Sequence, residues 1–525
     1  MKQTFLLIAL FTATSLFAQK KQTENWFTLD PVKDKIYGTG ADEAYKILKD
    51  KQAKPVIVAV IDSGVDPDHE DLKEVIWINA LEIPGNDVDD DKNGYVDDVN
   101  GWSFLGGKNG DINYEATELA RMYQKLNKKY SGLDPSSLSG KDEKEYQEYI
   151  KIKTDFITEQ TKQEQQVQGI TIFSGYLDKV KSRNNGVLDK KAFKNYTPEN
   201  EFEKEINKKL KVAFALGLIS PTELETQIAM GKDQLENMLK NNKLNADSIR
   251  TYMVGDNVND PNERFYGNNH VQGPDALHGT HVAGIIAAVR NNNLGIKGVA
   301  DHVKIMILRA VPNGDERDKD IANAIRYAVD NGATIINMSF GKYYSPDKAV
   351  VDEAVKYAQS KDVLLIHAAG NDSKDNDLEL SFPSRELSSG ELAGNWIQVG
   401  ATSAKKGKNL IGSFSNYGKT KVDLFAPGVD IYSTVPGNKY LNESGTSMAC
   451  PSTAGVAAII RSYFPELKAE EVKAVLMRTV VTYKKDVVIP GTEKEKKNLK
   501  DLSVSGGVVN ANNAVKELMG LNKKK

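Results

Sequence analysis

Short apolar runs alternate with amphipathic stretches along much of the chain. Residues 54–61 (KPVIVAVI) form an almost continuous apolar run of strand length, which predicts a strand buried on both faces of a sheet. From residue 303 onward the pattern predicts helices at 320–329 and 347–359 and strands at 303–308, 334–338, 363–368, 396–401 and 422–425. Such alternation predicts an α/β fold with a mostly parallel sheet, covered by helices on both faces through right-handed crossovers.

The segment from residue 116 to 257 has a different character. It is rich in Lys, Glu, Gln and Asn and has helix starts at 139–142, 197–198 and 220–223, the last a capping box with proline at the first helical position. The apolar sides predicted for its two main helices consist of Ile150, Ile152, Phe156 and Ile157, and of Leu210, Val212, Phe214 and Leu216. Because the segment contains no His, Cys or Trp, we expect a helical insertion without a catalytic role.

The two ends of the chain and its composition bear on location and partners. Residues 1–18 have the pattern of a secretory signal peptide, and no later segment is long and apolar enough to span a membrane. We therefore expect an exported protein, periplasmic or secreted, with a short lead-in at 19–50 and a lysine-rich tail at 519–525. The net charge of −3 gives no reason to expect attraction to nucleic acid or to a membrane surface. The single cysteine, Cys450, excludes an intrachain disulfide and is expected to be a small buried packing residue.

Three polar residues stand at the ends of predicted strands or the beginnings of helices. Ser447 lies in GTSMACPSTAGVAA (445–458), a tight turn followed by a helix of small residues, whose N-terminus would stabilise a developing oxyanion. A nucleophilic serine needs a base and an acid that orients the base. Asp62 follows the first apolar run, and His278 opens a second small-residue helix, HGTHVAGIIAA (278–288). Taken alone, Ser447 fits an ordinary N-cap serine equally well.

Three motifs resemble the catalytic boxes of the subtilisin-like serine proteases, the subtilases. They occur in that family's order of Asp, His and Ser: VIDSG (60–64), HGTHVAG (278–284) and GTSMA (445–449). The resemblance implies a subtilisin-like three-layer fold at residues 51–115 and 258–518 and a secreted endopeptidase that acts through an acyl-enzyme intermediate. It also implies that Ser447 is the nucleophile, His278 the general base and Asp62 the orienting acid.

The same resemblance extends to the substrate. In LLIHAAGN (364–371) it implies that the side-chain amide of Asn371 joins the Ser447 backbone N–H in the oxyanion hole. It further implies that two segments wall the primary specificity pocket and that one of them pairs with the substrate backbone; their residues are Ser339, Phe340, Gly341, Ala369 and Gly370. The expected partners are therefore proteins or peptides bound as extended strands. His281 is expected to be a packing histidine.

An acidic loop at residues 87–98 (DVDDDKNGYVDD) contains six aspartates, which repel one another unless a cation is present. Read from residue 89, the spacing resembles an EF-hand calcium loop, with a glycine at the sixth position and a backbone carbonyl ligand at the seventh. The predicted ligands are Asp89, Asp91, Asn93, Tyr95 and Asp97. We expect a structural calcium ion; the alternative is a solvated acidic turn, because the twelfth position is Asn100 in place of a glutamate.

Alternatives remain for the function and for the insertion. A transpeptidase would use the same residues but shield its acyl-enzyme from water, and a catalytically silent, calcium-dependent binding protein would keep the scaffold alone. Competent residue types at all four catalytic positions favour the protease. The insertion is either a helical elaboration on the side of the domain or a lid beside the cleft. As a lid, it would restrict substrates or replace a propeptide, for which residues 19–50 are too short.

Overall fold

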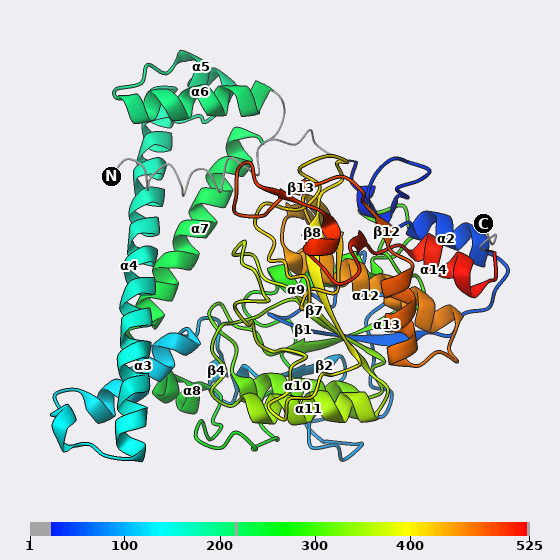
Figure 1. The fold of residues 1–525 in the computed structure, drawn as a ribbon, viewed down its shortest axis with the longest axis horizontal. Helices are drawn as coiled ribbons and strands as arrows, with labels where there is room; N and C mark the ends of the chain where they lie inside the picture. Colours follow the sequence, from blue (N-terminus) through cyan, green and yellow to red (C-terminus); the bar gives the residue numbers. More distant parts are fainter. Residues whose placement is uncertain (1–22, 216–218, 522–525) are drawn as a thin grey trace. The chain divides into compact units, whose positions relative to one another are not determined.

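A nine-stranded sheet forms the centre of the computed structural model (Figure 1). Its strand order is β12-β15-β9-β8-β7-β6-β1-β5-β2, and every neighbouring pair is parallel except β12 with β15. The strands are β1 (Val56–Asp62), β2 (Gly101–Ser103), β5 (Val303–Arg309), β6 (Ile335–Met338), β7 (Leu364–Ala368), β8 (Trp396–Thr402), β9 (Leu424–Pro427), β12 (Val481–Thr482) and β15 (Gly507–Val508). The predicted α/β fold with a mostly parallel sheet is confirmed.

Helices cover both faces of this sheet. Alternate side chains of β1 enter different cores, with Val58 and Val60 in one and Ala59 and Ile61 in the other. The first core is completed by α2 (Ala41–Leu48), α9 (Leu277–Ala287), α12 (Thr446–Tyr463), α13 (Ala469–Arg478) and α14 (Ala511–Leu518), and the second by α10 (Asp318–Asp330) and α11 (Lys348–Ser360). Because β1, β6 and β7 are parallel, their carboxyl ends lie at the same edge of the sheet.

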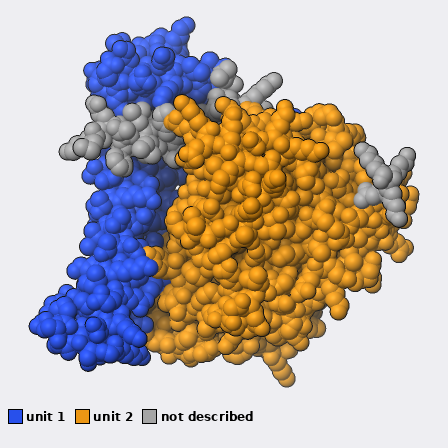
Figure 2. Space-filling model, in the orientation of Figure 1, with its two compact units in different colours: residues 1–23, 114–246 blue, residues 24–113, 247–525 orange. Residues whose placement is uncertain are grey.

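The structure describes residues 23–215 and 219–521, which divide into two units (Figure 2). The larger unit holds residues 24–113 and 247–521, and the smaller unit holds the remainder. The larger unit also contains short elements: η1 (Trp26–Thr28), η3 (Leu499–Asp501) and the hairpins β3 (Gly106–Gly107) with β4 (Gly110–Asp111), β10 (Ile431–Val435) with β11 (Lys439–Glu443), and β13 (Val487–Val488) with β14 (Lys496–Lys497). The predicted signal peptide lies outside the described residues. Among residues 23–215 and 219–521, none of the helices has both the length and the apolar character needed to cross a membrane.

The smaller unit is helical, as its sequence predicts. Its elements are α3 (Glu118–Tyr130), η2 (Pro135–Ser137), α4 (Lys141–Ser182), α5 (Lys190–Asn195), α6 (Glu201–Ala215) and α7 (Pro221–Asn241), and α8 (Ala246–Met253) begins at its boundary. The long helix α4 contacts both α3 and α7. The predicted capping box is present at the start of α7, where Ser220 and Glu223 bond each other's backbone N–H groups.

Two predictions about the helices of this unit are wrong in detail. Ile152 and Phe156 are buried in α4, but Ile150 and Ile157 are exposed. Likewise, Leu210 and Phe214 of α6 are buried while Val212 is exposed, and Leu216 lies outside the described residues. Residues four apart share a helix face and residues two apart do not, so each predicted apolar side contains positions from opposite faces. The helix predicted to start at 197–198 begins at the later residue Glu201.

Candidate active site

Asp62 is the last residue of β1, between the parallel neighbours β5 and β6. Its side chain is buried, and Oδ1 accepts a hydrogen bond from the backbone N–H of Ser63 at 2.8 Å. The same oxygen lies 2.7 Å from Nδ1 of His278. A carboxylate accepts hydrogen bonds, so Nδ1 carries the proton of this pair and Nε2 is left as the basic nitrogen.

Two glycines allow α9 to approach the end of β1. A Cβ atom on Gly279, the residue after His278, would lie 2.1 Å from the carbonyl oxygen of Gly64. Gly64 itself has a φ of +118°, and a Cβ there would lie 2.3 Å from the carbonyl oxygen of Gln272. These close backbone contacts bring the first turn of α9 against Asp62, which is why the short hydrogen bond to His278 can form.

The environment of His278 makes it a stronger base. Burial lowers the pKa of this histidine, but the charge of Asp62 and the hydrogen bond to it outweigh burial, so the net pKa is raised. The His278 side chain is nevertheless 38% exposed, which leaves it accessible to a substrate. A raised pKa and an accessible Nε2 suit a group that accepts a proton and returns it.

Ser447 is the second residue of α12, at the position that the sequence predicts for the nucleophile. Its Oγ donates to the carbonyl oxygen of Ser339 at 3.0 Å, and Ser339 Oγ donates to the carbonyl oxygen of Ser447 at 2.9 Å. The structure therefore pairs Asp62 with His278, and Ser447 with the end of β6. For His278 to accept the Ser447 proton, the hydroxyl group would have to turn away from Ser339; catalytic hydrogen bonds often tighten only when substrate is present.

Asn371 follows β7 and has a defined side-chain orientation. Its Oδ1 accepts hydrogen bonds from the backbone N–H of Thr446 at 2.8 Å and from Thr446 Oγ1 at 3.0 Å. Because the N–H of Thr446 can only donate, the oxygen of the amide must face it, and Nδ2 is left to donate elsewhere. Thr446 Oγ1 accepts from the N–H of Gly370 at 3.1 Å, which ties β7 to α12. Thr446 is not among the residues predicted for the site, because a threonine next to the serine has no distinguishing pattern in the sequence.

The predicted wall residues follow the adjacent strands β6 and β7. Met338 pairs with His367 in this register, so Ser339-Phe340-Gly341 and Ala369-Gly370 leave the sheet at the same edge. Gly370 has a φ of +106°, and a Cβ on it would lie 2.4 Å from Nδ2 of Asn416. A side chain at this position is therefore excluded, and the wall remains open backbone.

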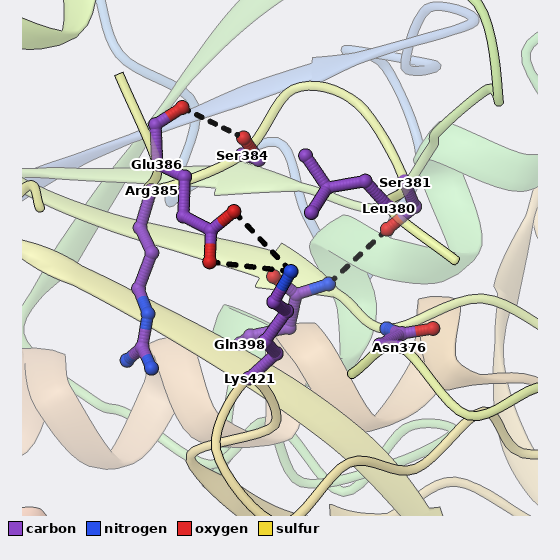
Figure 3. A pocket seen from close by; sticks show the side chains of 8 residues that line it. All are labelled: Asn376, Leu380, Ser381, Ser384, Arg385, Glu386, Gln398 and Lys421. Carbon is purple, nitrogen blue, oxygen red and sulfur yellow. Dashed lines mark hydrogen bonds and ion pairs between the residues drawn. The ribbon is translucent and has the colours of Figure 1, made fainter. Parts of the chain in front are cut away.

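A small polar pocket contacts one of these wall segments through a single lining residue (Figure 3). It is lined by Asn376, Leu380, Ser381, Ser384, Arg385, Glu386, Gln398 and Lys421. Asn376 connects it to the wall by donating from Nδ2 to the Ala369 carbonyl oxygen at 2.9 Å. Its charged groups are paired, because Lys421 lies 3.2 Å from the Glu386 carboxylate and Arg385 bonds Asp423 at 2.9 Å. These contacts indicate that the pocket stabilises the wall.

Two residues that the sequence assigns to packing are buried in the larger unit. His281 Nε2 lies 3.1 Å from the Ile431 carbonyl oxygen and 3.0 Å from that of Leu441, and burial lowers its pKa to about 3. A neutral histidine that donates to two carbonyl groups fits a structural role. Cys450 is also buried, and burial raises the pKa of its thiol to about 12.

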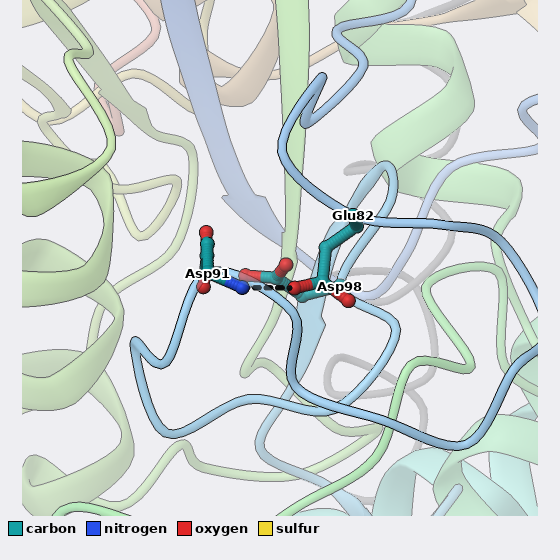
Figure 4. Close-up of side chains that lie close together, drawn as sticks. All are labelled: Glu82, Asp91 and Asp98. Atoms are coloured by element: carbon teal, nitrogen blue, oxygen red, sulfur yellow. Dashed lines mark hydrogen bonds between the residues drawn. The ribbon is translucent and has the colours of Figure 1, made fainter.

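An acidic cluster forms in the predicted calcium loop (Figure 4). It consists of Glu82, Asp91 and Asp98, each with a carboxylate oxygen within 4.8 Å of the others. Burial raises the pKa of Glu82 and of Asp98, and the neighbouring carboxylates add to this effect. The three carboxylates, two of them buried, form an all-oxygen set suited to a hard cation such as calcium.

Of the five predicted calcium ligands, only Asp91 belongs to this cluster. The carboxylate of Asp89 accepts the backbone N–H groups of Asn93 and Gly94, and that of Asp97 accepts three N–H groups from residues 85–87. Asn93 donates from Nδ2 to Asp91 at 3.1 Å and to Asp98 at 2.9 Å, while Tyr95 is a buried aromatic residue. Glu82 and Asp98 were not predicted. Glu82 precedes the acidic loop, and Asp98 adjoins the predicted Asp97.

Comparison with known proteins identifies the family. The subtilase family matches residues 53–510 of this chain. A thermophilic serine proteinase of Bacillus sp. (strain AK1) is 45% identical over 186 residues, which are 35% of this chain and 42% of the relative. Subtilisin Savinase of Lederbergia lenta is 35% identical over 207 residues, covering 39% and 70% of the two chains. The alignment thus spans less than half of the first relative's length.

A solved structure of proteases from Pseudoalteromonas arctica covers 94% of this chain and 97% of its own, at 19% identity and a TM-score of 0.46. The match of the family to residues 53–510, most of the chain, shows that this protein belongs to the subtilase family.

Proposed function

We propose that this protein is an exported serine endopeptidase that hydrolyses peptide bonds through Asp62, His278 and Ser447. The observation that carries the proposal is the 2.7 Å hydrogen bond between Asp62 and His278, in a chain whose Ser447 lies in the first turn of α12. His278 Nε2 takes the proton of Ser447 as its Oγ attacks the peptide carbonyl, and then returns that proton to the leaving amine. Water hydrolyses the resulting acyl-enzyme by the same two proton transfers.

The remaining parts of the proposed site hold the substrate. Asn371 Nδ2 and the Ser447 N–H, which is in the first turn of α12 where N–H groups lack an intrahelical acceptor, stabilise the tetrahedral oxyanion. The segment 339–341 pairs with the backbone of an extended protein or peptide substrate, and together with 369–370 walls the pocket for its side chain. The peptidase domain comprises residues 51–115 and 258–518, with the helical insertion between them.

Labelling with a fluorophosphonate tests this function directly. We expect the purified protein to take up one equivalent of label, and the Ser447→Ala and His278→Ala variants to take up none, because the reagent needs an activated serine. The circular dichroism spectrum and melting temperature of each variant serve as the folding control. A correctly folded wild-type protein that takes up no label would contradict the proposal and favour the catalytically silent binding protein.

Calcium is the second part of the proposal, with Glu82, Asp91 and Asp98 as the side chains that would hold it. The ion would neutralise the acidic loop and make it rigid. We expect calcium to raise the melting temperature; at a free concentration 100-fold above the Kd the gain in stability is about 2.7 kcal/mol. Differential scanning calorimetry with calcium and with a chelator measures this shift.

Charge-neutral variants separate binding at this cluster from a general salt effect. Asp98→Asn should lose most of the calcium-induced shift, which is taken for each variant as the difference between calcium and chelator, because the Asp98 carboxylate also accepts from Asn79, Asn93 and Tyr327. Asp87→Asn is the matched control, since Asp87 is exposed in the same loop and lies outside the cluster. An equal calcium shift in Asp98→Asn and wild type would exclude this cluster as the site.

A further inference from the structure

The hairpin of β10 and β11 is fastened to the first turns of α9. His281 of α9 donates from Nε2 to the carbonyl oxygens of Ile431 and Leu441, one on each strand. Ser433 Oγ donates to the His281 carbonyl oxygen at 2.7 Å. The helix that carries His278 and the strand that leads into Ser447 are therefore held together by side chains that bond to backbone carbonyl oxygens.

This attachment brings Glu443 beside His278. Glu443 is the last residue of β11 and pairs with Ile431, and it lies two residues beyond Leu441 on the same strand face. Leu441 and Glu443 are about 7 Å apart along the strand, and His281 and His278 are about one helical turn, or about 5.4 Å, apart along α9. The two spacings are therefore similar. Because Leu441 contacts His281, Glu443 lies near His278. The Glu443 carboxylate and the protonated His278 ring attract each other.

The Glu443 carboxylate has acceptor capacity to spare. In the described part of the chain no hydrogen bond or ion pair is made by this side chain, which is neither fully buried nor fully exposed. The other acidic groups that act on His278 are less available: Asp62 is buried, with Oδ1 bonded to His278 and Ser63 and Oδ2 out of reach of solvent, while Asp275 accepts from Leu277 N–H and Asn313 Nδ2. Glu443 is thus the acidic group near the base that a substrate can still use.

The position of Glu443 relative to the reaction determines which part of a substrate it meets. In the proposed function, the acyl half of the substrate lies along 339–341, and His278 delivers its proton to the leaving amine. The residue immediately after the scissile bond is therefore on the side of His278. We propose that Glu443 binds the cationic side chain of that residue, so that the enzyme favours lysine or arginine directly after the scissile bond. This inference rests on the proposed function.

Paired peptide substrates test the preference. Two peptides share one acyl half and carry either lysine or glutamine directly after the scissile bond. We expect the wild-type kcat/KM to be about tenfold higher for the lysine peptide, the range of a charge-assisted hydrogen bond. The ratio should fall to about one in Glu443→Gln and below one in Glu443→Lys. Because each ratio is taken within one enzyme preparation, differences in active fraction cancel.

The control is Glu466→Gln, which removes the same charge from an exposed position and should keep the wild-type ratio. An equal ratio in wild type and Glu443→Gln, or a wild-type ratio near one, would overturn the inference while cleavage of both peptides still supported the protease. If neither peptide is cut and no fluorophosphonate is taken up, the proposed function itself is contradicted, and this inference with it.

A pH profile gives a second readout that a merely structural role would not produce. Glu443, like Asp62 and Asp275, favours the charged form of His278 and so raises its pKa. The reaction needs His278 neutral, so the acid limb of kcat/KM follows that pKa. In Glu443→Gln the limb should move to lower pH for the glutamine peptide, with Asp62 and Asp275 still in place. An unmoved limb would contradict the proximity of Glu443 to the base.

Discussion

The Asp62→Asn enzyme is expected to keep about one ten-thousandth of the wild-type kcat, as is typical when a triad acid becomes an amide. Asp62 Oδ1 accepts from Nδ1 of His278 and so leaves Nε2 as the base. An amide can instead donate to Nδ1, which favours the tautomer with its proton on Nε2, and that tautomer cannot accept the Ser447 proton. Steady-state hydrolysis of a chromogenic peptide at saturating concentration measures the loss.

A neighbouring acid provides the control for this prediction. Asp275 also acts on the charge of His278, but its carboxylate bonds Leu277 and Asn313 and does not touch the ring. The Asp275→Asn variant should therefore lose far less activity than Asp62→Asn. Comparable losses in the two variants would show that negative charge near His278, and not the tautomer, is what Asp62 supplies.

The second large effect is expected on stability, from Arg250→Ala. Arg250 is completely buried in the larger unit, where Nε bonds Asp256 at 2.8 Å and the two terminal nitrogens bond Asp320 at 2.8 and 2.7 Å. Its removal would leave two buried carboxylates without their principal counter-charge. Breaking a buried pair in this way costs about 3–5 kcal/mol of unfolding free energy. Chemical denaturation followed by tryptophan fluorescence measures the change.

An exposed arginine pair shows whether burial is responsible. Arg478 lies 2.6 Å from Glu517, with side chains 51% and 30% exposed. Exposed ion pairs contribute about 0–1 kcal/mol, so Arg478→Ala should be nearly neutral. Equal losses of unfolding free energy in Arg250→Ala and Arg478→Ala would mean that the buried Arg250 network stabilises the protein no more than an exposed ion pair does.

The hydrophobic pattern of the sequence predicted six of the nine strands of the central sheet, β1 and β5 to β9, for a physical reason. A strand buried on both faces must be apolar throughout, so β1 and β5 to β8 stand out from the polar segments around them. The pairing of Asp62 with His278, which lies on helix α9 and not at the end of a strand, was implied by the resemblance of the two motifs to those of subtilases. The resting hydrogen bond from Ser447 to Ser339 has no such signal, because it depends on the rotation of one hydroxyl group.

The acidic cluster and Arg250 show where local patterns fail. The Glu82 carboxylate accepts the backbone N–H groups of Asp90, Asp91 and Asp97, so the chain folds back on itself before the acidic loop. A calcium motif read as consecutive positions cannot include such a residue. Arg250 lies in a polar helix, and its partners Asp256 and Asp320 come from a loop and from α10. Whether a charged side chain is buried depends on segments outside its own helix, and the periodicity within that helix does not reveal them.

The single buried thiol makes this protein a convenient host for site-directed probes. With its pKa raised to about 12 and no exposure to solvent, Cys450 stays protonated and out of reach of maleimide reagents at neutral pH. A cysteine introduced at an exposed position would therefore react alone, without first mutating the native one. A spin label or dye could thus be placed in the acidic loop or on α4 while α12, the helix that contains both Ser447 and Cys450, keeps its natural packing.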